Sequence, residues 1–218
     1  MVRRKMVKVK ICGLTNREDA QKACEYGADL VGFLFAPESP RCISPDKAKD
    51  IIETLPDEVG KTGLFRDQDP EEVARYVLLC GLNYVQLHGD ESPEYCRMLK
   101  ESAESQGTKI KIIKTFKVKD KIIGISPVGY DAVDHYLFDT YHPEMMGGTG
   151  TRFDWNVLKG IEKDKSFFVA GGLDPDNVAE AIQMLRPYGV DVASGVERSV
   201  GKKDWDKIKE FILNAKNA

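Results

Sequence analysis

The sequence predicts a closed (β/α)8 barrel, the TIM-barrel fold, as a single domain over residues 1–218. Eight short β-rich apolar segments recur at similar intervals, and capped helical patterns separate most of them. The length of 218 residues also suits a small barrel of this kind. An open, doubly wound sheet with about six strands is the alternative, and the eight segments favour the barrel. The expected strands are residues 7–12, 29–35, 59–65, 84–88, 109–116, 135–139, 167–170 and 190–194.

Most of the expected strands are continuous apolar runs. Residues 30–35 read Leu-Val-Gly-Phe-Leu-Phe, without a charged side chain. Such a run is typical of a strand in a parallel sheet that is covered on both faces. Parallel strands need crossover connections, and the intervening helical patterns supply them. Those patterns cover residues 17–26, 45–54, 70–80 and 175–185, and a charged helix at 204–216 ends the chain.

The starts of the expected helices share one chemistry. Ser44, Asp69, Ser92 and Asp174 each precede a proline. This pattern predicts an N-cap side chain followed by proline in the first helical turn. At the first helix, Thr15 and the glutamate three residues later have the spacing of a capping box.

The ends of the helices are marked by glycine. Gly27, Gly81 and Gly189 each stand just before an expected strand and predict C-caps. The fifth unit is the least regular, because glycine and proline interrupt residues 117–133. No linker rich in proline or serine divides the chain, so we expect one domain.

Composition excludes several classes of function. The chain has 32 Lys and Arg against 35 Asp and Glu, a net charge of −3, which argues against nucleic-acid binding. Apolar runs such as 30–36 are far shorter than the roughly 20 residues that span a bilayer. The five cysteines are odd in number and show no Cys-x-x-Cys pair, which is typical of a reducing cytoplasm. We also expect no metal site, since no Cys/His cluster or paired carboxylates occur at strand ends.

The active site of such a barrel forms at the carboxyl ends of its strands. Cys12 ends the first expected strand and Asp139 the sixth. These strands are three steps apart in an eight-stranded barrel, so their ends face each other across its mouth. The pair therefore suits proton removal at one atom and proton delivery at another. For Cys12, an inert buried thiol is an equal alternative on position alone.

Other strand ends offer groups for binding. Gly171-Gly172 and Ser194-Gly195 follow the last two strands, where barrels often bind phosphate, although glycines there also serve simple tight turns. Arg41 is a planar donor suited to a carboxylate, and a solvated loop arginine is the alternative. His88 is either an acid or base or a hydrogen-bonded structural residue.

Read in order, these segments resemble the phosphoribosylanthranilate isomerase family of tryptophan biosynthesis. The resemblance spans nearly the whole chain, and its motifs are jointly specific. The matching segments are residues 10–15 (Lys-Ile-Cys-Gly-Leu-Thr), 39–41 (Ser-Pro-Arg), 86–90 (Gln-Leu-His-Gly-Asp), 138–140 (Phe-Asp-Thr), 147–150 (Gly-Gly-Thr-Gly), 153–155 (Phe-Asp-Trp), 170–178 and 191–197.

The resemblance implies an Amadori rearrangement of N-(5-phosphoribosyl)anthranilate that uses no metal or cofactor. From the matching positions in the family, Asp139 would be the general acid, Cys12 the general base, and Arg41 the residue that holds the anthranilate carboxylate. Gly171, Gly172, Ser194 and Gly195 would bind the phosphate. Gly148 lies in a glycine loop that would close over the substrate, and His88 is carried over without a defined role.

Two departures from the family pattern concern the periphery of this site. Thr151 follows the glycine loop where the family often has a basic residue, and Thr115 replaces a small apolar one. The rival functions are another phosphosugar barrel, such as a ribulose-phosphate epimerase or an indole-forming enzyme, and an isomerase that also accepts the aminoimidazole substrate of histidine synthesis. A non-catalytic barrel that binds a phosphorylated ligand is a rival from another class. We expect a monomer or a homodimer.

Overall fold

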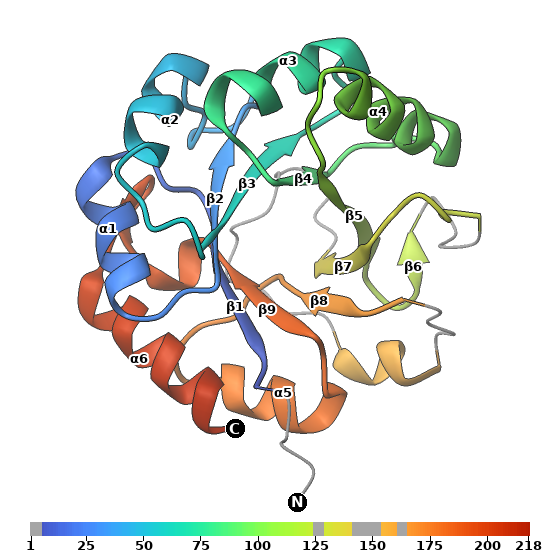
Figure 1. Cartoon of the computed structure of the whole chain (residues 1–218). Helices are drawn as coiled ribbons and strands as arrows, with labels where there is room; N and C mark the ends of the chain where they lie inside the picture. Colours follow the sequence, from blue (N-terminus) through green and yellow to red (C-terminus); the bar gives the residue numbers. More distant parts are fainter. Residues whose placement is uncertain (1–5, 124–128, 141–153, 161–164) are drawn as a thin grey trace, which may run out of the picture.

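The computed structural model describes residues 6–123, 129–140, 154–160 and 165–218, and it confirms the barrel (Figure 1). Adjacent strands pair in the order β4-β3-β2-β1-β9-β8-β7-β5, and a further β4–β5 pairing closes the ring. All of these pairings are parallel. The open-sheet alternative is therefore wrong. The strands are β1 (Lys8–Ile11), β2 (Leu30–Leu34), β3 (Gly60–Phe65), β4 (Tyr84–Leu87), β5 (Lys111–Val118), β7 (His135–Thr140), β8 (Phe167–Val169) and β9 (Gly189–Val192).

Helices surround the ring of strands (Figure 1). None of the described helices is long and apolar enough to cross a membrane. The described residues between β5 and β7 form the short strand β6 (Ile122–Ile123), antiparallel to β5, in place of a helix, which agrees with the irregular pattern there. The α-helices of the described residues are α1 (Arg17–Glu25), α2 (Pro45–Ile52), α3 (Pro70–Cys80), α4 (Pro93–Ser105), α5 (Val178–Leu185) and α6 (Trp205–Asn217). The same residues also form the 3-10 helices η1 (Trp155–Gly160) and η2 (Ser194–Val196) and the hairpin of β10 (Glu197–Ser199) and β11 (Lys202–Lys203).

Alternation along the strands separates two apolar regions. The larger core lies between strands and helices and includes Val9, Ile11, Val31 and Phe33. Residues at the intervening positions point into the barrel, as the pleat of a strand requires. They form two smaller clusters, made of Leu30, Ile113, Leu137, Phe168 and Ala170 in one and of Cys12, Leu34 and Leu64 in the other. The barrel is thus filled below, and Cys12 belongs to its upper layer.

Three of the four predicted N-caps are confirmed. Ser44, Asp69 and Ser92 accept hydrogen bonds from backbone N–H groups in the first turns of α2, α3 and α4. The prediction for Asp174 is wrong, because α5 begins at Val178. The Asp174 carboxylate accepts the N–H groups of Asp176 and Asn177 instead, and it closes a turn that precedes the helix.

The predicted capping box at the first helix is also wrong. Asn16 is the N-cap of α1, and its side chain accepts the Asp19 N–H at 2.9 Å. Its amide also donates to the Asp19 carboxylate at 2.7 Å. The Thr15 hydroxyl donates instead to the Gly201 carbonyl at 2.6 Å. Asp19 further accepts bonds from the Lys203 N–H and the Trp205 indole. The first turn of α1 is therefore also bonded to a distant part of the chain, although its cap is local.

Two of the three predicted glycine C-caps agree with the structure, and the third does not. Gly27 and Gly81 follow α1 and α3 with positive φ, as expected. Gly189 is not a C-cap, because α5 ends at Leu185 and Arg186 takes the left-handed cap position. Gly189 begins β9, where an added Cβ would lie 2.3 Å from the Phe168 ring. The last barrel strand also ends at Val192, which places Ser194 in η2 rather than in the strand.

Asn16→Ala should lower the free energy of unfolding by about 1 kcal/mol, because the first N–H groups of α1 lose their cap. Urea denaturation measures the change. Glu18→Ala is the matched control, since the exposed Glu18 would be the second member of the capping box. An equal loss in both variants would restore the capping box.

Candidate active site

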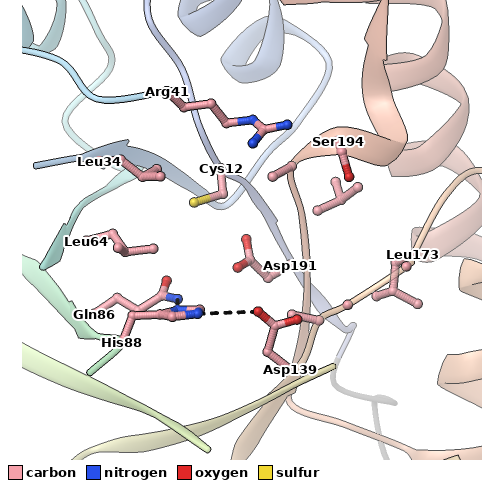
Figure 2. A pocket seen from close by; sticks show the side chains of 15 residues that line it. Cys12, Leu34, Arg41, Leu64, Gln86, His88, Asp139, Leu173, Asp191 and Ser194 are labelled. Carbon is pink, nitrogen blue, oxygen red and sulfur yellow. Dashed lines mark hydrogen bonds and ion pairs between the residues drawn. The ribbon is translucent and has the colours of Figure 1, made fainter. Parts of the chain in front are cut away.

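A pocket lies at the carboxyl-terminal mouth of the barrel, with about 570 Å³ of space that includes the part open to solvent (Figure 2). Its lining comes from the ends of strands distributed around the ring, which is where barrels place their sites. Gly195 adjoins the lining residue Ser194, and Gly148 lies outside the described residues. The predicted residues that line the pocket are Cys12, Arg41, His88, Asp139, Gly171, Gly172 and Ser194.

The structure places Cys12 and Asp139 on opposite sides of this pocket. The strands β1 and β7 are separated around the ring by β9 and β8. Figure 2 shows the Asp191 carboxylate between the two residues. Cys12 is 4 % exposed and Asp139 is 8 % exposed. A small molecule in the pocket therefore meets both groups while it is largely shielded from water.

Asp139 is set up as a carboxylic acid. Burial raises its pKa to about 7, and the negative charge of Asp191 adds to the rise. The Thr140 N–H donates to Asp139 Oδ1 at 2.8 Å, which opposes the rise without cancelling it. Oδ2 faces His88 Nε2 at 3.5 Å. A substantial fraction of Asp139 therefore carries its proton near neutral pH.

His88 is neutral beside this carboxyl. Burial, assisted by the charges of Lys117 and Lys114, lowers its pKa to about 3. The Gln86 amide nitrogen lies 3.3 Å from His88 Nδ1. The tautomer with its hydrogen on Nε2 gives both ring nitrogens a partner, because Nδ1 then accepts from Gln86 and Nε2–H faces Asp139. The ring can then stabilise the Asp139 carboxylate once its proton has left.

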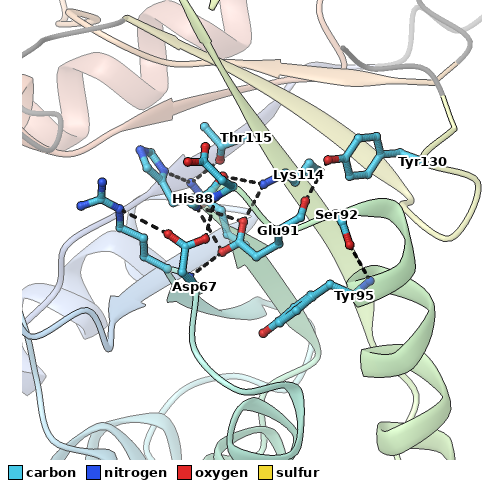
Figure 3. A network of polar contacts seen from close by, with 12 residues as sticks. Asp67, His88, Glu91, Ser92, Tyr95, Lys114, Thr115 and Tyr130 are labelled. Atoms are coloured by element: carbon cyan, nitrogen blue, oxygen red, sulfur yellow. Dashed lines mark hydrogen bonds and ion pairs between the residues drawn. The ribbon is translucent and has the colours of Figure 1, made fainter. Parts of the chain in front are cut away.

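The buried ion pair between Lys114 and Glu91 holds the loop that follows His88 in place (Figure 3). The Lys114 ammonium, fully buried, contacts the Glu91 carboxylate at 2.5 Å and the Gly89 carbonyl at 2.7 Å. Glu91 in turn accepts the N–H of Gly89 and, at 2.9 Å, that of Asp67. These bonds join the loops that follow β3 and β4 to the middle of β5. His88, next to Gly89, is thereby held on a rigid support.

Cys12 lies among charges that the sequence analysis did not single out. Burial raises the pKa of its thiol, while the neighbouring Lys10 ammonium lowers it, and the net shift is upward. Lys10 is fully buried and pairs with Asp191 at 3.0 Å. The sequence did contain one indication of this charged group, a lysine at an inward position of an apolar strand, two residues before Cys12. Composition could not show that this lysine is buried.

Arg41 is paired rather than solvated. Its Nε and Nη2 each lie 2.8 Å from an oxygen of Glu197, and the guanidinium is buried, with 7 % of the residue exposed. Lys203 also contacts Glu197, at 3.1 Å. The reading as a solvated loop arginine is therefore wrong. Arg41 already binds a carboxylate in the two-pronged geometry that it offers, but this one belongs to the protein.

The two glycine turns are sterically required. Gly171 has a φ of 81°, and an added Cβ would lie 2.2 Å from Thr140 Oγ1 and 2.7 Å from Asp139 Oδ1. At Gly195 an added Cβ would lie 2.0 Å from the Leu173 carbonyl oxygen. Tight backbone packing thus explains both glycines. The predicted phosphate site at these turns stays a prediction, and it is compatible with a backbone that no side chain covers.

The remaining described histidine belongs to the scaffold. His135 stacks on Tyr188 with ring centroids 4.6 Å apart. Within the part of the chain that the structure describes, no three His, Cys, Asp or Glu side chains converge in a way that could hold a metal ion. The expected absence of a metal and of a cofactor stays a prediction.

Comparison with known proteins identifies the family. Residues 9–214 match the family model described as N-(5'-phosphoribosyl)anthranilate (PRA) isomerase. The chain belongs to this family. Curated members from Trichlorobacter lovleyi and Geobacter sulfurreducens are 46% and 43% identical to it. The first alignment covers 98% of this chain and 100% of the relative, and the second covers 97% and 99%. Family membership makes the protein an isomerase, as the resemblance implied.

Solved structures agree with the family. The phosphoribosyl anthranilate isomerase of Thermotoga maritima superposes with a TM-score of 0.84 and 42% identity, over 98% of this chain and 100% of that one. Another isomerase structure, in complex with reduced 1-(o-carboxyphenylamino)-1-deoxyribulose 5-phosphate, has a TM-score of 0.81, 41% identity and the same coverage. A 3-hexulose-6-phosphate synthase from Salmonella typhimurium reaches 0.72 at 14% identity over 96% and 98% of the chains, so it shares the fold alone.

Asp139→Asn should stabilise the protein at pH 8 by more than about 1 kcal/mol and leave its stability nearly unchanged at pH 4. The folded-state pKa, about 7, lies above the ordinary value of 3.8. The folded protein therefore keeps the proton while the unfolded chain loses it, and stability falls as pH rises between these values. Urea denaturation at both pH values tests this.

The exposed Asp57 provides a control for that experiment. Asp57→Asn should change stability little at either pH. If Asp139→Asn behaves like Asp57→Asn, the buried carboxyl carries no penalty at pH 8 and the raised pKa is refuted.

Proposed function

We propose that the protein converts N-(5-phosphoribosyl)anthranilate into 1-(2-carboxyphenylamino)-1-deoxyribulose 5-phosphate, an Amadori rearrangement in tryptophan biosynthesis. The observation that carries this proposal is the placement of Cys12 and Asp139 on opposite sides of one buried pocket, with an Asp139 pKa of about 7. The reaction moves a proton from one carbon and delivers a proton to an oxygen. An acid and a base that reach the substrate from different sides suit it.

Asp139 acts first, as the general acid. Its protonated Oδ2 donates to the ring oxygen of the ribose, so the bond between C1′ and that oxygen breaks. The anilino nitrogen supplies the electron pair, and an iminium forms. Charge then develops on Asp139, where the His88 Nε2–H at 3.5 Å and the Thr140 N–H at 2.8 Å can stabilise it.

Cys12 completes the rearrangement as the general base. Its thiolate removes the proton from C2′, and the electrons of that bond neutralise the iminium to form an enolamine. The enolamine then tautomerises to the ketone. Because Cys12 and Asp139 lie on opposite sides of the pocket, the two proton transfers do not compete for one group.

Binding is assigned to the rest of the pocket. Arg41 would bind the carboxylate of the anthranilate, either in place of Glu197 or together with it. Lys203 would remain paired with Glu197. Gly171, Gly172, Ser194 and Gly195 would bind the phosphate at the ends of the last two barrel strands. The ligand of the related isomerase complex carries both a carboxyphenyl group and a phosphate by its name. Gly148 remains a proposed contact outside the described residues.

The rival functions differ in how well they agree with the family and with the residues of the pocket. Family membership disfavours an epimerase or an indole-forming barrel. Turnover of the aminoimidazole substrate distinguishes an isomerase of broader specificity. A non-catalytic barrel would keep the glycine turns without any need for the acid and the base. A cytoplasmic location and a homodimer fit the proposal; an isomerase of Thermotoga maritima is described as dimeric.

Cys12→Ser and Asp139→Asn should each lower turnover of phosphoribosylanthranilate by about a thousandfold or more. The assay follows the loss of anthranilate fluorescence. Cys96→Ser is the matched control, since Cys96 is another buried cysteine outside the pocket. Circular dichroism verifies that all variants are folded.

Full activity in either pocket variant would overturn the assigned mechanism. A wild-type protein that binds phosphorylated ligands but shows no turnover would favour the binding-protein alternative. Turnover of the aminoimidazole substrate would broaden the proposed specificity.

Arg41→Lys should raise KM by tenfold or more with a smaller effect on kcat, because lysine lacks the two-pronged donor geometry. N-(5-phosphoribosyl)aniline, which has no carboxylate, provides the control. The wild type and the variant should bind this analogue equally. A defect of the same size on the analogue would show that Arg41 does not recognise the carboxylate.

A further inference from the structure

A lysine ammonium is buried inside the barrel directly beneath the pocket. Lys10 lies at an inward position of β1 and is 0 % exposed. It is directly opposite Asp191 of β9 in the strand register, and Nζ lies 3.0 Å from Asp191 Oδ1. Burying such a pair is costly, and an apolar pair of similar volume often serves stability as well or better. The charges therefore call for an explanation beyond stability.

The position of Lys10 connects it to Cys12. The two residues are on the same face of β1, and both reach the space above Gly32 of the neighbouring strand. A Cβ at position 32 would lie 2.8 Å from Cys12 Sγ and 3.2 Å from Lys10 Nζ. The missing side chain therefore leaves room for the thiol and the ammonium to approach each other.

Lys10 supplies a positive charge that offsets one of the two negative charges present in this space once Cys12 is ionised. Ionisation of Cys12 would place a thiolate close to the Asp191 carboxylate, inside a barrel that excludes water. Burial works against the charge on Lys10, but Asp191 and Cys12 outweigh it and raise the pKa of Lys10 above its ordinary value. The ammonium is thus a stable positive charge next to the thiol.

We propose that Lys10 is the positioning residue that makes the Cys12 thiolate attainable, with Asp191 opposing it, so that the pair sets the proton affinity of the base. The proposal deepens the proposed function, because it concerns the residue assigned there as the general base.

The other charged groups that face Cys12 do not replace Lys10. Lys203, from the segment that precedes α6, lowers the pKa of Cys12 to a smaller extent than Lys10 does. Arg41, from the loop after β2, also interacts electrostatically with Cys12, which contributes to raising the pKa of Arg41. Both of these cations contact the single carboxylate of Glu197, which offsets one of their two positive charges. Asp191, from β9, is the anion that acts against ionisation.

The same pair acts on the acid. Asp191 raises the pKa of Asp139, and Lys10 lowers it together with Lys117 of β5. The neutral His88 at the end of β4 completes the groups that face this carboxyl. Removal of either member of the pair should therefore change both limbs of the pH profile.

The test measures the rate at which iodoacetamide alkylates Cys12 between pH 6 and 10, by mass spectrometry of the peptide that contains it. Lys10→Met should lower this rate at pH 8 by about tenfold or more, one unit in the apparent pKa. Asp191→Asn should raise it, and the double variant should lie between the two. In turnover assays Lys10→Met should lower kcat and move the limb due to the base to higher pH.

Lys8→Met is the matched control. Lys8 lies on the same strand and pairs with Asp29 at 2.7 Å, away from the pocket. Its replacement should leave Cys12 alkylation unchanged. A merely structural role for Lys10 predicts the same null result for Lys10→Met, as long as the protein is folded.

An unchanged alkylation profile in folded Lys10→Met would overturn the proposal. If that variant does not fold, Asp191→Asn decides, because an unchanged or slower alkylation there contradicts an opposing role. The alkylation series does not require turnover. A wild-type protein without isomerase activity would therefore refute the proposed function, while the series would still decide whether Lys10 controls Cys12.

Discussion

Closure of the parallel sheet is the constraint on which the site depends. The pairing of β4 with β5, together with that of β1 with β9, turns a row of strands into a ring. In a ring, strands far apart in the sequence end at one mouth. Cys12 and Asp139 would lie on the same edge of an open sheet, but only closure makes them face each other across a pocket and removes both from water.

Burial has opposite consequences for these two groups. It raises the pKa of Asp139 to about 7, which suits an acid near neutral pH. It also raises the pKa of Cys12, which is unfavourable for a base. The nearby Lys10–Asp191 pair provides charges of both signs at this point. The site therefore combines a common loss of solvent with local charges that distinguish the proposed acid from the proposed base.

Local signals predicted the scaffold well where they acted over a few residues. The caps at Ser44, Asp69 and Ser92 are of this kind, since a side chain before proline needs only the next turn of helix. The cap of α1 and the start of α5 were predicted wrongly, although the start of α1 at residue 17 is as predicted. At α5 the Asp174 carboxylate accepts the N–H groups of Asp176 and Asn177, so a local turn takes the place of the first helical turn. At α1, Asn16 and not Thr15 caps the helix, while Asp19 also binds Lys203 and Trp205.

The sequence by itself determined the order of strands and helices, the family, and the positions of Cys12, Asp139, Arg41 and the glycine turns at strand ends. Tertiary structure alone decided their electrical environment. Lys10 and Asp191 are 181 residues apart, and Arg41 and Glu197 are 156 apart. Such pairs leave no local pattern, because their charges interact strongly only after the barrel has brought them together and excluded water.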